Sequence, residues 1–142
     1  MNPNSPPTPA RRIQIALLCL RLSVFLVMLM WTVDKFVRPA HAASIFEKYY
    51  RLSGMGNALT CILGGLEIVL LIAFVLGIGK RVTYGAVLVL HGVSTFSSFM
   101  HYLAPFEGPS LLFFAAWPML AACFSLYLLR DLDTLGTIRR RA

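Results

Sequence analysis

Four long apolar stretches alternate with short polar segments along the chain. They cover residues 13–33, 57–76, 82–102 and 111–129. Each is about as long as the 20-residue helix that crosses the roughly 30 Å hydrocarbon core of a bilayer. The stretches are too continuous for the alternating pattern of barrel strands, and an open sheet edge is not stable in lipid. The pattern therefore predicts an all-α fold, an integral membrane four-helix bundle.

The segments outside these helices predict two tails and one further helix. Residues 1–12 contain four prolines and indicate a disordered N-terminal tail, residues 13–129 form a single transmembrane domain, and residues 130–142 form a basic cytoplasmic tail. In the first long loop, Ser44 and Glu47 have the spacing of a capping box. The apolar side chains around them lie largely on one helical face, so the pattern predicts a short helix in the outer membrane interface.

Composition supports a membrane protein. Hydrophobic residues make up 58% of the chain and charged residues 13%, and the mean hydropathy is +0.72. A soluble domain has about 25% charged residues, so this chain has too few charges to cover a surface that faces water. The same values exclude intrinsic disorder, and three cysteines within apolar stretches do not make a disulfide scaffold.

The basic residues indicate a membrane topology and no nucleic-acid partner. The net charge is +7, but Lys and Arg punctuate the apolar stretches and do not gather on one solvated face. A cytoplasmic N-terminus places eight Lys and Arg residues inside and four outside, which favours this orientation.

A cleaved signal peptide is the alternative interpretation of the first stretch. The length of the stretch is evidence against it, because the apolar part of a signal peptide usually has about 7–15 residues. We expect a multi-pass protein of the inner (plasma) membrane with both termini cytoplasmic and the lipid bilayer as its surroundings. The inner eight are Arg11, Arg12, Lys80, Arg81, Arg130, Arg139, Arg140 and Arg141, and the outer four are Lys35, Arg38, Lys48 and Arg51.

Three ionisable residues lie near mid-depth in the predicted helices: Arg21, Glu67 and His91. Counted at 1.5 Å per residue, each lies about 12–14 Å from the inner boundary. A charge there costs several kcal/mol unless it has a partner, and two interpretations follow. In one, Arg21 and Glu67 form an ion pair that fixes the helix register, with His91 hydrogen-bonded nearby. In the other, the three form a buried polar site: Arg21 holds an anionic or carbonyl oxygen, Glu67 accepts a proton and His91 relays it.

Each of these residues belongs to a polar stripe along its helix, and lipid excludes such stripes. We therefore expect the stripes to face one another inside the bundle. A metal site is not expected, because His91 and His101 are about 15 Å apart along one helix and no carboxylate or cysteine stands at ligand spacing beside either. No phosphate loop or nucleophile elbow is present, so no catalytic residue is assigned. The secondary polar stripe comprises Lys35, Thr60, Ser94, Ser98, His101 and Tyr102.

Several motifs resemble the DoxX family of small four-helix membrane proteins. The resemblance covers the chain from Arg21 to His91 and departs at Met30-Trp31-Thr32-Val33, where the family usually has a glycine a few residues before the lysine. It implies that the family's polar positions are occupied here by Arg21, Lys35 and Glu67. The matching motifs are the transmembrane Arg21, Lys35-Phe36, Gly64-Gly65-Leu66-Glu67, and the run Leu76-Gly77-Ile78-Gly79-Lys80-Arg81.

The resemblance also implies a link to quinone and thiol redox chemistry. On that basis we expect an accessory subunit of a membrane redox or quinone-linked system, with a quinone as the candidate ligand of the polar site. The chain offers no ligands for a redox cofactor of its own, so we expect no covalently bound cofactor and no electron transfer by this chain alone. The alternatives are a non-catalytic structural or interaction subunit, and a small carrier or proton pathway formed by an oligomer. Candidate partners are a membrane or peripheral oxidoreductase and further copies of the chain.

Overall fold

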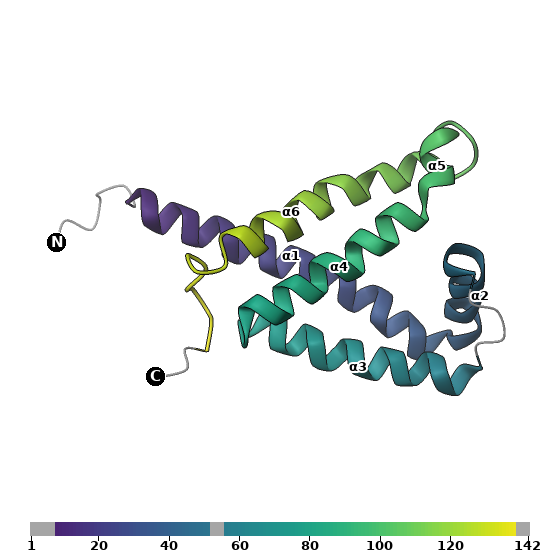
Figure 1. Cartoon of the computed structure of the whole chain (residues 1–142), viewed down its shortest axis with the longest axis horizontal. Coiled ribbons are helices and arrows are strands. Elements are labelled where there is room, and N and C mark those ends of the chain that lie inside the picture. The colour runs from purple at the N-terminus through teal and green to yellow at the C-terminus, as the bar shows by residue number, and fades with distance from the viewer. Residues whose placement is uncertain (1–7, 52–55, 139–142) are drawn as a thin grey trace.

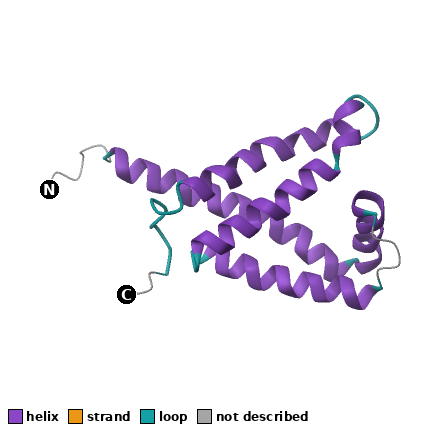
Figure 2. Ribbon diagram, in the orientation of Figure 1, coloured by secondary structure: helices purple, strands orange, loops and turns teal. Residues whose placement is uncertain are grey.

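Continuous apolar stretches favour helices in lipid, because a helix satisfies every backbone hydrogen bond within one segment. The structure, a computed structural model, describes residues 8–51 and 56–138. Within those ranges every regular element is a helix and none is a strand (Figure 2). The all-α prediction is confirmed.

The helices form two pairs that diverge toward one end of the molecule. α1 packs mainly on α3, and α4 packs mainly on α6. Figure 1 shows the two pairs close together near the C-terminal segment and spread apart toward α2 and α5. The elements are α1 (Pro9–Val37), α2 (Pro39–Tyr50), α3 (Asn57–Val75), α4 (Lys80–Ser97), α5 (Phe99–Leu103), the 3₁₀ helix η1 (Ser110–Ala115) and α6 (Ala116–Leu128).

Three helical segments in the described residues are long and apolar enough to cross a membrane. They are Pro9–Val37, Asn57–Val75 and the continuous segment Ser110–Leu128. The prediction of four spans is therefore supported for three. The remaining helix, α4, has 18 residues and begins with Lys80 and Arg81, and several polar residues follow along it. Its length and composition do not by themselves make it a fourth span.

The predicted tails are partly structured. α1 begins at Pro9, so residues 9–12 are helical and do not belong to a disordered tail that ends at residue 12. The helix starts there because proline is favoured at the first helical position. Residues 130–138 return to the bundle, where the Ile138 N–H donates to the Leu76 carbonyl at 2.9 Å. The rest of the predicted tails, residues 1–7 and 139–142, lies outside the described residues.

The helix of the first loop is present but starts earlier than predicted. α2 begins at Pro39, with Arg38 as its N-cap, and no side chain caps it. Ser44 lies within the helix, and its hydroxyl donates to the His41 carbonyl at 2.7 Å. The capping-box prediction was wrong, because proline at the first helical position starts the helix five residues before the serine.

Two predicted helices are interrupted. α4 ends at Ser97 and the short α5 follows, so the predicted helix 82–102 is not continuous. The hydroxyls of Thr95 and Ser98 donate to carbonyls four residues earlier in the chain. Such bonds compete with the helical ladder and favour bends. The stretch 111–129 begins as a 3₁₀ helix and becomes α-helical at Ala116, two residues before Pro118.

The buried apolar core is small and lies where the two helix pairs meet. Each of the four long helices contributes to it, whereas Ile62, Val69 and Leu112 are more than half exposed. Outward-facing apolar side chains of this kind are compatible with lipid contact. The core residues are Leu17, Val24, Met28, Leu71, Phe74, Tyr84, Val87, Cys123 and Leu126.

Gly64 marks a close approach of α3 to α1. A Cβ atom at this position would lie 2.9 Å from the Phe36 ring and 3.3 Å from Cβ of Lys35. A Cβ atom at the adjacent Gly65 would meet nothing within 4 Å. The pair of glycines therefore provides a contact position and a matched control on the same helix.

We expect Gly64→Val to lower the free energy of unfolding by about 1–3 kcal/mol more than Gly65→Val, the usual cost of overpacking. Both changes alter helix propensity in the same way, so the difference isolates the contact with α1. Thermal unfolding in detergent measures it. Equal melting temperatures for the two variants would contradict the close approach of the helices.

Candidate functional site

The Arg21 guanidinium is buried and paired with Asp133, which follows the last helix in the sequence. Arg21 Nη1 lies 2.9 Å from Asp133 Oδ2, and the exposed fractions of the two side chains are 1% and 0%. The Tyr84 hydroxyl donates to the same carboxylate oxygen at 2.7 Å. Arg21 Nη2 donates to the carbonyls of Leu135 and Gly136. These groups replace part of the water that a buried guanidinium loses. Arg21 Nε and Asp133 Oδ1 are buried without a hydrogen-bond partner among the described residues.

Residues 130–138, which we call the C-terminal latch, hold Asp133 against the bundle. The Lys80 ammonium at the start of α4 donates to the Asp133 carbonyl. The Ile138 N–H bonds to the end of α3 at Leu76. Figure 1 shows the latch, in yellow, close to the turn between α3 and α4. The latch therefore joins α1, α3 and α4 at the end of the molecule opposite α2.

Sequence reasoning missed Asp133 because it follows the last apolar stretch, in a segment that basic residues marked as a tail. One signal was available, since a buried arginine requires a counter-charge. Two acids, Asp131 and Asp133, interrupt the basic segment. Only Asp133 faces inward, because the Asp131 side chain is 84% exposed.

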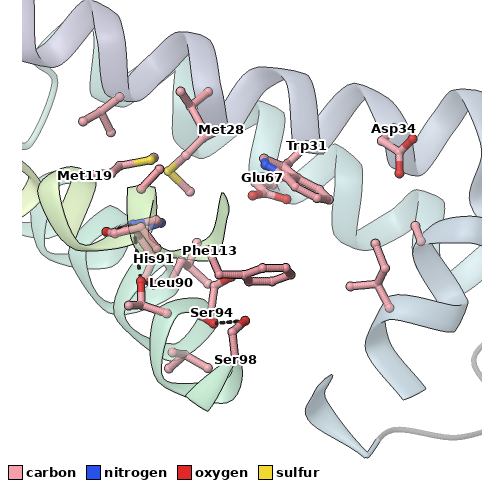
Figure 3. A pocket seen from close by; sticks show the side chains of 18 of the residues that line it. Met28, Trp31, Asp34, Glu67, Leu90, His91, Ser94, Ser98, Phe113 and Met119 are labelled. Carbon is pink, nitrogen blue, oxygen red and sulfur yellow. Dashed lines mark hydrogen bonds between the residues drawn. The ribbon is translucent and has the colours of Figure 1, made fainter. Parts of the chain in front are cut away.

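A cavity of about 1050 Å³ lies between the diverging helix pairs. Its walls come from α1, α2, α3, α4 and the η1–α6 segment, and apolar side chains predominate (Figure 3). Of the three residues predicted to form one site, Glu67 and His91 line this cavity and Arg21 does not. The structure thus separates the predicted site into the cavity and the Arg21–Asp133 pair. The charged and hydroxyl residues of the lining are Ser23, Asp34, Lys35, Tyr50, Glu67, Ser94, Thr95 and Ser98.

Glu67 is paired with Lys35 on the cavity wall. Lys35 Nζ lies 2.6 Å from Glu67 Oε2, and the exposed fractions of the side chains are 14% and 17%. Lys35 Nζ also donates to the Trp31 carbonyl at 3.4 Å. The ion pair considered from the sequence, Arg21 with Glu67, is therefore not formed, since each residue has another partner. The Lys35–Glu67 pair ties α1 to α3 and leaves a charged group beside the cavity.

His91 is held by its Nε2 atom. That nitrogen lies 3.1 Å from the Ala116 carbonyl and 3.4 Å from the Thr95 hydroxyl. A carbonyl oxygen accepts and never donates, so the neutral ring must bear its proton on Nε2. Nδ1 is then an acceptor. His91 thus links α4 to the start of α6 through Nε2, and Nδ1 has no hydrogen bond within the described residues.

Some residues of the secondary polar stripe line the cavity and others do not. Ser94 and Ser98 line the cavity, and the Ser98 hydroxyl donates to the Ser94 carbonyl at 3.1 Å. Thr60 is buried and bonds to the Gly56 carbonyl of its own helix. The Tyr102 hydroxyl is buried and has no hydrogen-bond partner among the described residues.

His101, on α5, connects α2 to η1. Its Nε2 atom lies 2.9 Å from the Tyr49 hydroxyl, and its Nδ1 atom lies 3.0 Å from the Ser110 hydroxyl. The ring stacks on Phe113 at a centroid distance of 3.9 Å. This cluster anchors α2 over the wide end of the bundle.

Asp34 fixes the corner between α1 and α2. One carboxylate oxygen accepts from Arg38 Nε at 2.6 Å, and the other lies 2.7 Å from His41 Nδ1. Asp34 is 9% exposed, whereas Arg38 and His41 are 64% and 45% exposed. Both oxygens have partners, so Asp34 positions the chain at the edge of the cavity.

Across residues 8–51 and 56–138, no group of three or more His, Cys, Asp or Glu side chains could hold a metal ion. In comparisons with known proteins, no family model matches the chain, and neither a curated protein nor a solved structure matches it.

We expect Asp133→Asn to destabilise the protein by about 3–5 kcal/mol, because it leaves the Arg21 charge buried without a counter-ion. Asp131→Asn is the matched control, since its carboxylate is exposed, and we expect a change within about 0.5 kcal/mol. Thermal unfolding in detergent compares the two variants. A double variant, Arg21→Met with Asp133→Asn, is expected to recover part of the loss, and similar melting temperatures for the two single variants would contradict a structural role for the pair.

Proposed function

We propose that this chain is a DoxX-like membrane protein that binds a quinone-like molecule in the cavity and serves as an accessory subunit of a quinone-linked redox system. The observation that carries the proposal is the cavity itself: it is large, mainly apolar, and has an ion pair and a histidine on its walls. Small-molecule sites have this character, with a few polar groups set in an apolar pocket.

The volume of about 1050 Å³ is at the upper end of the roughly 300–1,000 Å³ typical of ligand pockets. It offers room for an aromatic ring together with part of an apolar chain. Apolar walls favour such a chain, and Lys35–Glu67 and His91 provide polar contacts for substituents on the ring.

The cavity is open to the lipid-facing side of the bundle. Leu66, Val93 and Leu112 line it, yet they are 64%, 50% and 75% exposed. Side chains that belong both to the wall and to the outer surface mark an opening. A ligand dissolved in the bilayer can enter there without passing through water.

The accessory role rests on the resemblance and on the lack of redox-cofactor motifs in the sequence. A quinone bound here exchanges electrons with a membrane or peripheral oxidoreductase that associates with this chain. The polar groups of the cavity bind and orient the ring.

The proposal includes a topology. α4 is the fourth span of the inner membrane, because it packs along α6 and α3 between two helices that are long and apolar enough to cross. The larger number of basic residues in the two tails and the α3–α4 turn favours a cytoplasmic location for both termini. The cavity then lies in the outer half of the bilayer.

We expect a short-chain benzoquinone to quench the fluorescence of Trp31 saturably, because this side chain lines the cavity. The measurement uses Trp117→Phe protein in nanodiscs, so that Trp31 is the remaining tryptophan. Ser94→Phe fills part of the cavity and is expected to weaken binding about tenfold or more, corresponding to 1.4 kcal/mol. Ser125→Phe lies outside the cavity lining and is expected to bind normally. Quenching that is linear with quinone, or equal in the two serine variants, would overturn the proposed site.

The topology predicts opposite accessibility at the two ends of α4. In protein whose three cysteines are replaced by alanine, we expect a membrane-impermeant maleimide to label Phe106→Cys on intact cells, and to label Arg81→Cys only after lysis. Phe106 is 91% exposed in the turn before η1. Labelling of both positions from outside would show that α4 does not cross, and the reverse pattern would invert the orientation.

A further inference from the structure

The Glu67 carboxylate has one oxygen left for a ligand. Oε2 accepts from Lys35 at 2.6 Å, and Oε1 has no hydrogen bond within the described residues. Oε1 is also not among the buried side-chain atoms that lack a partner there, so it is not fully buried, and Glu67 lines the cavity. As a carboxylate, Glu67 only accepts hydrogen bonds.

His91 supplies a second acceptor to the same cavity. Because the Ala116 carbonyl requires the proton on Nε2, the lone pair of the neutral ring is on Nδ1. Nδ1 has no hydrogen bond within the described residues and is not among their buried unpartnered atoms. Figure 3 shows the Glu67 carboxyl group and the His91 ring among the side chains around the cavity, from α3 and α4 respectively.

These two atoms distinguish the oxidation states of a quinone-like ligand. A quinone has carbonyl oxygens that only accept, so it leaves both Oε1 of Glu67 and Nδ1 of His91 unpaired. A quinol has hydroxyls that donate to these atoms and also accept from the Trp31 indole or the Lys35 ammonium. A site whose acceptors lose solvent on binding discriminates against an analogue that lacks the matching hydroxyl, because those acceptors are then left without a donor.

We propose that the cavity recognises a ligand with ring hydroxyls, and that it binds a quinol in preference to the corresponding quinone. The inference rests on the proposed function, and it specifies the form of the ligand that the site holds. Glu67 and His91 are the residues that determine this preference, and the apolar walls bind both forms alike.

The preference has a thermodynamic consequence for the bound couple. When the quinol binds more tightly than the quinone, the bound pair has a higher reduction potential than the free pair. For a two-electron couple, each tenfold ratio of dissociation constants raises the potential by about 30 mV. The site therefore stabilises the reduced ligand without any group of its own changing oxidation state.

The test compares three ligands with the unmodified protein in nanodiscs under anaerobic conditions. They are decylubiquinone, its quinol, and the dimethyl ether of that quinol, which has the same ring without donors. Nanodiscs with Ser94→Phe protein correct for partition into lipid. We expect the quinol to bind at least about tenfold more tightly than the quinone, and the dimethyl ether to bind no more tightly than the quinone.

A variant tests whether Glu67 determines the preference for the quinol. In Glu67→Gln the amide can donate to a quinone carbonyl, so we expect the ratio of dissociation constants to fall at least about threefold. Glu47→Gln is the matched control, because Glu47 is exposed and lies outside the cavity lining, and its ratio should equal that of the unmodified protein.

The outcomes separate the two proposals. Binding of the quinone as tightly as the quinol would overturn the preference while the proposed quinone site stands. Failure of all three ligands to bind the unmodified protein would overturn both. An unchanged ratio in folded Glu67→Gln protein would remove Glu67 from the recognition of the hydroxyl.

Discussion

The neutralisation of Arg21 is the interaction on which the rest of the structure depends. A guanidinium that is 1% exposed on a membrane helix needs a fixed counter-charge, and Asp133 supplies it from 112 residues further along the chain. To bring that carboxylate inward, residues 130–138 must fold back across the turn between α3 and α4. The pair therefore gathers the two helix pairs at one end, where the apolar core also lies. At the opposite end no ion pair joins α1 to α4 within residues 8–51 and 56–138, and there the helix pairs diverge around the cavity (Figure 1).

The other charged pair has a different geometry and a different consequence. Lys35 and Glu67 lie on two helices of the same pair, so their contact stabilises α1 against α3 without closing the space toward α4. Because the pair is partly exposed to that space, one carboxylate oxygen remains available. His91 is similar, because its Nε2 atom is hydrogen-bonded to a backbone carbonyl of α6 whereas its Nδ1 atom has no hydrogen bond within the described residues. These structural bonds therefore fix the orientation of the carboxylate and of the imidazole on the cavity wall.

The sequence predicted the positions of the helices better than it predicted which side chains contact one another. Hydropathy located the four long helices because an apolar stretch in lipid has few alternatives to a helix. It misplaced the start of α2, since the Ser44–Glu47 spacing competes with Pro39, and it missed the break after Ser97, which depends on local hydroxyl bonds. It identified Arg21, Glu67 and His91 as exceptional residues, because their cost in lipid depends only on residue type. Which of these side chains pair with one another depends on the rotation of each helix about its axis and on the folding of residues 130–138 back onto the bundle. Neither leaves a periodic pattern in the sequence.

The position of Asp133 also bears on how the protein is made. α1 precedes the other described helices in the chain and carries an arginine, a residue whose insertion near a helix centre costs about 2.5–3.5 kcal/mol. Its counter-ion is synthesised 112 residues later, after all the described helices. Until Asp133 has been synthesised, the arginine lacks this counter-ion, so the Arg21–Asp133 pair forms only after the last helix. A chain that is released before Asp133 leaves the arginine without this partner.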